Sequence, residues 1–186
     1  ASGFVGTSLM ELLSKNGSQV IGVSRRVPPQ LPIGVVHKIV DIGPKTQWGE
    51  LFEGVKSVVH LADGFNAFER FGADADNEKA QLCAQATLNL ARAAFRARVK
   101  NFIYLSTIKA MAGSWASQIL NENSPPRPTS LYGQLKLAAE NEILQLAAGS
   151  ATRVINLRFP IVKKTGFVKE PQIHRIRRSD VFKFWK

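Results

Sequence analysis

Short apolar segments alternate with helical segments along most of this chain, and that alternation leaves few folds open to it. The apolar segments are rich in β-branched residues, and stretches of helical periodicity or loops rich in glycine and proline separate them. Nearly continuous apolar strands separated by helices are typical of a parallel sheet covered on both faces. The sequence therefore predicts an α/β fold, a doubly wound parallel sheet with helices on both faces.

The predicted elements follow one another without an internal repeat. The pattern predicts strands at residues 19–24, 35–41, 57–62, 101–106 and 152–157. It predicts helices at residues 7–16, 78–97 and 130–147. Gly17 fits the end of the first helix, because glycine readily adopts the left-handed conformation that closes many helices. Ser130 fits the start of the last helix, because its hydroxyl can accept a hydrogen bond from the first turn.

Length and composition restrict the class of protein. A chain of 186 residues is long enough for one domain with a hydrophobic core, which we place at residues 1–162. No apolar run reaches the length of a membrane span, and the first residues do not form a signal segment. The single cysteine, Cys83, excludes a disulfide framework and a Cys-based zinc site. We therefore expect a cytoplasmic domain with no metal site.

The positive charge is concentrated in the last segment. Residues 163–186 hold eight Lys or Arg residues and two acidic residues, so they carry +6 of the net charge of +11. One interpretation is a nucleic-acid-binding tail in which Phe182, Phe184 and Trp185 stack on bases. The other, which we favour, is a solvated end with no nucleic-acid partner.

Two glycines stand directly before the first predicted helix. Gly3 could let the backbone approach a pyrophosphate bound at the amino end of that helix, and Gly6 could allow close packing of the helix on the sheet. Phe4 and Val5 lie between them and would line the same loop. Two glycines before a helix are also common in a plain turn, so this pattern alone leaves both interpretations open.

The ends of the first two predicted strands, at 19–24 and 35–41, could contact the rest of a dinucleotide. Ser24 and Arg25 close the strand at 19–24, where an arginine would pair with the 2′-phosphate of NADP(H) and an acidic residue would bind the ribose of NAD(H). This favours NADP(H) and keeps NAD(H) possible; the alternative is a solvated basic loop. Asp41 and Ile42 close the next strand, where a carboxylate could hold the adenine amino group or begin a turn.

Tyr132 and Lys136 are four residues apart on a predicted helix, so their side chains project from one face. An ammonium group near a phenol lowers the phenol pKa, which makes tyrosine usable as an acid or base near neutral pH. Ser106 and Thr107 end a predicted strand, where open parallel sheets bind ligands and where a hydroxyl can hold a reacting oxygen. His60 lies inside another strand, and we favour a core imidazole over a proton-transfer role.

Seven segments in order resemble the extended short-chain dehydrogenase/reductases, specifically the NAD(P)-dependent epimerase/dehydratases. They are ASGFVG at 1–6, Asp41-Ile42, VVHLA at 58–62, TLNLARAA at 87–94, NFIYLSTIKAMAG at 101–113, YGQLKLAAE at 132–140 and Arg158-Phe159-Pro160. The stretch FIYLSTIK looks most like the UDP-glucose 4-epimerase and UDP-sugar 4-ketoreductase branch. The resemblance implies a Rossmann-type domain in strand order 3-2-1-4-5-6, here without its first strand and truncated at both ends.

The resemblance also implies the chemistry. Tyr132 would be the catalytic acid/base, Lys136 would lower its pKa and bind the nicotinamide ribose, and Thr107 would match the catalytic Ser/Thr. The cofactor would contact Gly3, Phe4, Val5, Gly6, Ser24, Arg25, Asp41, Ile42, Leu61, Ala62, Ser106, Tyr132 and Lys136. The substrate would be a nucleotide sugar that is epimerised or reduced at C4, in a homodimer built through residues 78–97 and 130–147. A cofactor-binding fragment without catalysis is the alternative.

Overall fold

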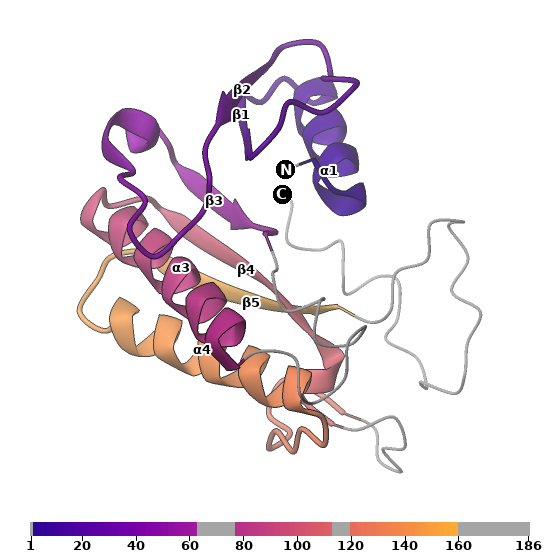
Figure 1. The fold of residues 1–186 in the computed structure, drawn as a ribbon, viewed down its shortest axis with the longest axis vertical. Helices are drawn as coiled ribbons and strands as arrows, with labels where there is room; N and C mark the ends of the chain where they lie inside the picture. Colours follow the sequence, from indigo (N-terminus) through magenta and orange to yellow (C-terminus); the bar gives the residue numbers. More distant parts are fainter. Residues whose placement is uncertain (1, 63–76, 113–119, 160–186) are drawn as a thin grey trace.

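The computed structural model describes residues 2–62, 77–112 and 120–159 (Figure 1). The helices are α1 (Phe4–Lys15), α3 (Asn77–Arg96) and α4 (Leu131–Ala147), with short 3-10 turns η1 (Gly49–Phe52) and η2 (Ile108–Ala110). The strands are β1 (Val20–Ser24), β2 (Val35–Ile39), β3 (Ser57–His60), β4 (Asn101–Thr107) and β5 (Arg153–Phe159). Every predicted strand and helix is therefore confirmed to within a few residues; the basic tail lies outside the described residues.

The described strands form two parallel sheets. In one, β1 pairs with β2, and in the other the order is β3-β4-β5. The break between them falls between β1 and β3, which is where the predicted order places the first strand of the full sheet. The structure thus confirms the α/β class and the parallel pairing, and it places β4 at the centre of the larger sheet.

The core lies between the β3-β4-β5 sheet and the helix pair α3 and α4, which run side by side over one face of that sheet (Figure 1). Along β4, alternate residues are fully buried against these helices: Phe102, Tyr104 and Ser106. The residues between them on β4 are half-buried, as expected for the opposite face of a strand. The buried cluster comprises Trp48, Leu88, Leu90, Ala91, Ala94, Val99, Phe102, Tyr104, Ala139 and Ile143.

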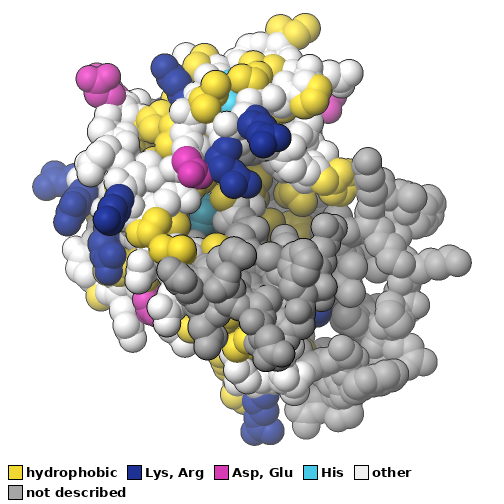
Figure 2. Space-filling view, in the orientation of Figure 1, with side chains coloured by type: hydrophobic (Ala, Val, Ile, Leu, Met, Phe, Trp, Pro, Cys, Tyr) yellow, Lys and Arg dark blue, Asp and Glu magenta, His cyan; other side chains and the backbone are white. Residues whose placement is uncertain are grey.

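The β1-β2 sheet and α1 are less covered than this core. Most of the large apolar side chains that are exposed belong to residues 4–39, among them Ile33 at 96% and Ile39 at 67%. Figure 2 shows apolar side chains at the surface over this part of the molecule. The loop after β2 is nonetheless fixed to α3, because Asn89 donates hydrogen bonds to the carbonyls of Gly43 and Thr46 at 3.1 and 2.9 Å.

None of the helices in the described ranges combines the length and the apolar character that crossing a membrane requires.

Candidate functional site

The carboxyl end of β4 is the centre of the candidate site. Ser106 is buried on the face that packs against α4, and Thr107, the last residue of the strand, is half-buried. The Thr107 hydroxyl accepts a hydrogen bond from the backbone N–H of Lys109 at 3.3 Å, which caps η2. The strand therefore ends in a turn fixed by the predicted catalytic hydroxyl itself.

α4 begins beside this turn. The Ser130 hydroxyl accepts a hydrogen bond from the backbone N–H of Gly133 at 3.1 Å, which confirms the predicted cap. The cap sets the start of the helix, so Tyr132 lies in its first turn and Lys136 one turn later. Tyr132 is half-buried, and the ammonium of Lys109 lies 5.8 Å from the centre of its ring.

Gly133 permits the close contact between α4 and η2. A Cβ at this position would lie 2.2 Å from the carbonyl oxygen of Lys109, closer than any side chain tolerates. We expect Gly133→Ala to push the first turn of α4 away from η2 and to destabilise the protein by about 1–3 kcal/mol, the usual cost of overpacking. Thermal unfolding of this variant measures the effect, with Gly43→Ala, where a Cβ has room, as the control. Equal unfolding temperatures for the wild type and Gly133→Ala would contradict the claim that glycine is required for the close contact between α4 and η2.

Lys136 reaches from α4 to the backbone of β4. Its side chain is 1% exposed, and its Nζ donates a hydrogen bond to the carbonyl of Leu105 at 2.6 Å. The same ammonium lies 4.2 Å from the centre of the Tyr104 ring, over its face, where the ring attracts a cation. Lys136 is thus a buried cation held next to Ser106 and Thr107.

His60 is part of the core beside this lysine. Its Nε2 lies 3.0 Å from the hydroxyl of Thr87, and its ring stacks on that of Tyr104 with centroids 5.7 Å apart. Burial, together with the charge of Lys136, lowers the pKa of His60 from 6.5 to about 3. The imidazole is therefore neutral at physiological pH, in agreement with the predicted core role.

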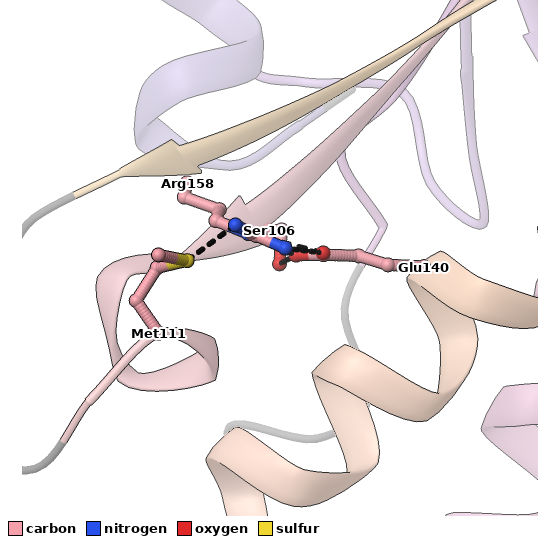
Figure 3. Close-up of polar contacts among 4 residues, drawn as sticks. All are labelled: Ser106, Met111, Glu140 and Arg158. Atoms are coloured by element: carbon pink, nitrogen blue, oxygen red, sulfur yellow. Dashed lines mark hydrogen bonds and ion pairs between the residues drawn. The ribbon is translucent and has the colours of Figure 1, made fainter. Parts of the chain in front are cut away.

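An ion pair between a buried carboxylate and a partly exposed arginine adjoins the site, and sequence reasoning assigned it no role (Figure 3). Glu140, 1% exposed on α4, accepts a hydrogen bond from the Ser106 hydroxyl. Arg158 of β5 donates to both carboxylate oxygens of Glu140, with Nη2 to Oε2 at 2.6 Å. The spacing of Tyr132, Lys136 and Glu140, each four residues apart, is the signal that could have placed Glu140 on the same face of the helix.

The predicted pyrophosphate loop forms the amino end of α1. Gly3 precedes the helix in an extended conformation, and among the described residues beyond its chain neighbours no atom lies within 4 Å of the position where its Cβ would be. No side chain caps this helix end, and its first turn holds no acidic residue. Gly6 is buried, whereas Phe4 is 49% exposed and Val5 half-buried. An open backbone at an uncapped helix terminus fits a bound pyrophosphate.

The predicted residues at the strand tips differ in their surroundings. The Ser24 hydroxyl donates to the carbonyl of Arg26 at 2.8 Å and lies 2.8 Å from His37 Nε2. It therefore stabilises the turn after β1. Arg25 and Asp41 are exposed. The remaining predicted contacts follow the ends of β2 and β3: Ile42 is half-buried and packs on the core, Leu61 is half-buried, and Ala62 is exposed.

The structure therefore places one group of predicted residues on two elements in contact. Ser106 and Thr107 end β4, Lys136 of α4 binds the preceding carbonyl of that strand, and Tyr132 lies in the first turn of the same helix. The glycine loop and the strand tips at 24–25 and 41–42 belong to α1 and the other sheet. The basic side chains on the face in Figure 2 are spread over several elements rather than gathered in one patch.

A parallel α/β sheet with polar side chains at a strand end and a glycine loop before a helix defines a dinucleotide-binding class of protein. Residues 1–163 match the family model described as NAD dependent epimerase/dehydratase family. The chain therefore belongs to the NAD-dependent epimerase/dehydratase family, whose members are enzymes.

Individual relatives agree with this assignment. A UDP-glucose 4-epimerase of Vibrio cholerae is 26% identical over 167 residues, which is 89% of this chain and 51% of the relative. The solved structure of MoeE5 in complex with UDP-glucuronic acid and NAD is 28% identical with a TM-score of 0.72, over 85% of this chain and 52% of that one. A UDP-N-acetylglucosamine 4-epimerase from Bacillus cereus has a TM-score of 0.65 at 25% identity, over 84% and 52%. The chain spans about half the length of these relatives.

Proposed function

We propose that this chain carries the cofactor-binding and proton-transfer part of an enzyme that oxidises and reduces a nucleotide sugar, as a 4-epimerase or 4-ketoreductase. The observation that carries the proposal is the junction of β4 and α4. Thr107 ends the strand, the buried Lys136 donates to the carbonyl of Leu105 on the same strand, and Tyr132 lies in the first turn of the helix. The relatives support the substrate class, because the three named above are two UDP-sugar epimerases and a protein bound to UDP-glucuronic acid.

In this proposal Tyr132 transfers the proton. Its phenolate takes the proton of a sugar hydroxyl, and its phenol returns a proton to the carbonyl oxygen in the reverse direction. The Lys136 ammonium favours the phenolate by its positive charge, which its hydrogen bond to Leu105 holds in place. The Thr107 hydroxyl holds the sugar oxygen while its charge changes.

The cofactor of this family would bind across the amino end of α1. Gly3 would let its pyrophosphate approach the backbone, and Asp41 would hold its adenine amino group. When bound, the nicotinamide accepts and returns the hydride of the sugar carbon. The family is NAD-dependent, whereas the finer preference for NADP(H) depends on Ser24 and Arg25.

The proposal is tested by adding UDP-glucose or UDP-glucuronic acid to the purified protein loaded with NAD and following nicotinamide absorbance. We expect substrate-dependent formation of the reduced nicotinamide, which is transient in a 4-epimerase because the hydride returns to the sugar, and oxidation of NADH by the 4-keto sugar in a 4-ketoreductase. The alternative, a cofactor-binding fragment without catalysis, gives NAD binding and no absorbance change. The proposed reaction is contradicted if neither sugar changes the absorbance and NADH also fails to reduce the corresponding 4-keto sugars.

Arg25 supplies a second test, because the proposed preference for NADP(H) over NAD(H) depends on its charge. If its guanidinium pairs with a 2′-phosphate, Arg25→Ala weakens NADPH binding by about tenfold or more, since a charged hydrogen-bonding pair is lost. The affinity of Arg25→Ala for NADH stays within about twofold of the wild-type value, because NADH has no such phosphate. Arg26→Ala, the neighbouring exposed arginine, is the matched control in a fluorescence titration. Equal losses of NADPH and NADH affinity in Arg25→Ala would refute the preference.

The homodimer and the cytoplasmic location stay predictions. One observation favours association through the helices: α3 and α4 keep Leu82 and Leu144 exposed at 43% and 49%. Sedimentation velocity tests this, and a monomer at micromolar concentration would exclude a stable dimer of this chain.

A further inference from the structure

Glu140 is a buried carboxylate that the proposed proton transfer does not use. It is 1% exposed and lies one helical turn after Lys136 on α4. A carboxylate removed from water is costly unless charged and hydrogen-bonding partners surround it. Its presence next to the candidate site therefore requires a reason beyond packing.

Arg158 gives this carboxylate a fixed direction (Figure 3). Its Nε lies 3.1 and 3.0 Å from Oε1 and Oε2 of Glu140, and its Nη2 lies 2.6 Å from Oε2. The other terminal nitrogen, Nη1, contacts the sulfur of Met111, which directly follows η2. Because Arg158 belongs to β5 and Glu140 to α4, the pair joins the elements on both sides of the end of β4.

The pair also acts on β4 directly. The Ser106 hydroxyl donates to Glu140, and the neighbouring carbonyl of Leu105 accepts from Lys136. Two successive residues of β4 are thus bound to two successive turns of α4. The next residue, Thr107, carries the hydroxyl of the proposed reaction, so any slip of β4 along α4 would move it relative to Lys136.

Stability alone does not explain the buried carboxylate of Glu140 with its partly exposed partner, since apolar side chains of similar size often stabilise a core as well or better. What a two-pronged arginine–carboxylate pair adds is orientation. We propose that Glu140 and Arg158 are positioning residues for the proton transfer, which hold Ser106 and the end of β4 in register with Lys136. This inference rests on the proposed function.

The test is the double variant Glu140→Gln/Arg158→Met, which removes both charges of the pair, so neither member is left facing an uncompensated partner. We expect an unfolding temperature near that of the wild type and an NADH Kd within about twofold. We expect kcat to fall about tenfold to a hundredfold with little change in KM, because small misplacements of reacting groups have effects of this size. A kcat within twofold of the wild type would overturn the inference.

A second variant controls for misfolding of the double variant. Arg158→Lys keeps the positive charge and loses the two-pronged geometry, so it should show the same loss of kcat to a smaller extent. If its kcat equals that of the wild type, orientation by Arg158 is not required and the inference fails.

Amide hydrogen exchange separates this inference from the proposed function, since it needs no turnover. In the double variant we expect exchange at Ser106 and Thr107 to rise about tenfold while exchange at Phe102 in the same strand is unchanged. If exchange rises in this way but the wild type shows no sugar-dependent reaction, the proposed function is refuted. The role of the pair in holding the end of β4 then still stands. Unchanged exchange at Ser106 and Thr107 would refute the pair's role even in an active enzyme.

Discussion

Tyr132→Phe is expected to lower kcat by about 100-fold to 10,000-fold, the range that general acid–base catalysis contributes. The substitution removes one hydroxyl from a half-buried ring in the first turn of α4 and leaves the helix cap at Ser130 intact. Folding and cofactor binding should therefore change little. Steady-state kinetics with a nucleotide sugar, together with thermal unfolding, separate the loss of catalysis from a loss of structure.

The chain offers a matched control, because it has only two tyrosines. Tyr104 is 1% exposed in the middle of β4, where its ring lies under Lys136. Tyr104→Phe keeps that ring and should retain most of the activity. If Tyr132→Phe keeps full turnover, or if Tyr104→Phe loses as much, the assignment of the proton donor to Tyr132 is wrong.

Acid should destabilise the protein through His60. Its folded pKa of about 3 lies below the ordinary value of 6.5, because it is buried and close to the charge of Lys136. Between these two values the unfolded chain binds a proton that the folded protein does not. Stability therefore falls as the pH decreases from about 6.5 to about 3, by about 4–5 kcal/mol for this one group. Above pH 6.5 the effect is absent.

Denaturant unfolding at several pH values, compared with His60→Gln, measures this contribution. The variant has no group to protonate at this position, so the difference in unfolding free energy between the two proteins should change by up to about 1.4 kcal/mol per pH unit within that window. Parallel pH dependences for the wild type and His60→Gln would contradict a buried neutral imidazole.

The sequence was sufficient for the elements around the site because their patterns are strong. The apolar run at 101–106 and the serine before 131 predicted β4 and the start of α4, and both were found. The break between β1 and β3 also agrees with the predicted strand order. The elements depend on local periodicity, which a single sequence can reveal, whereas the strand order was implied by the family resemblance.

The contacts between elements could not be predicted in the same way. Glu140 and Arg158 are 18 residues apart, and only the packing of α4 on β4 and β5 brings them together. Ser24 was predicted as a cofactor contact, and its hydrogen bond to the carbonyl of Arg26 could not be predicted with it. Periodicity gives the face on which a side chain lies, whereas its partner depends on the tertiary arrangement.

The central claim is that this chain forms a nucleotide cofactor site with its pyrophosphate at the amino end of α1, and Gly3 allows the most direct test. Asn at this position can adopt the extended backbone found there and is a good helix cap, and the space beside Gly3 is open. Gly3→Asn should therefore fold as the wild type does, while its side chain occupies the space that the pyrophosphate needs.

The measurement is a titration of both proteins with NADH, following nucleotide fluorescence and thermal unfolding together. We predict saturable binding that raises the unfolding temperature of the wild type. Gly3→Asn should unfold at the same temperature without NADH and bind it at least about tenfold more weakly. A wild type whose unfolding temperature does not respond to NADH, or a Gly3→Asn variant that binds NADH equally well, would contradict the account.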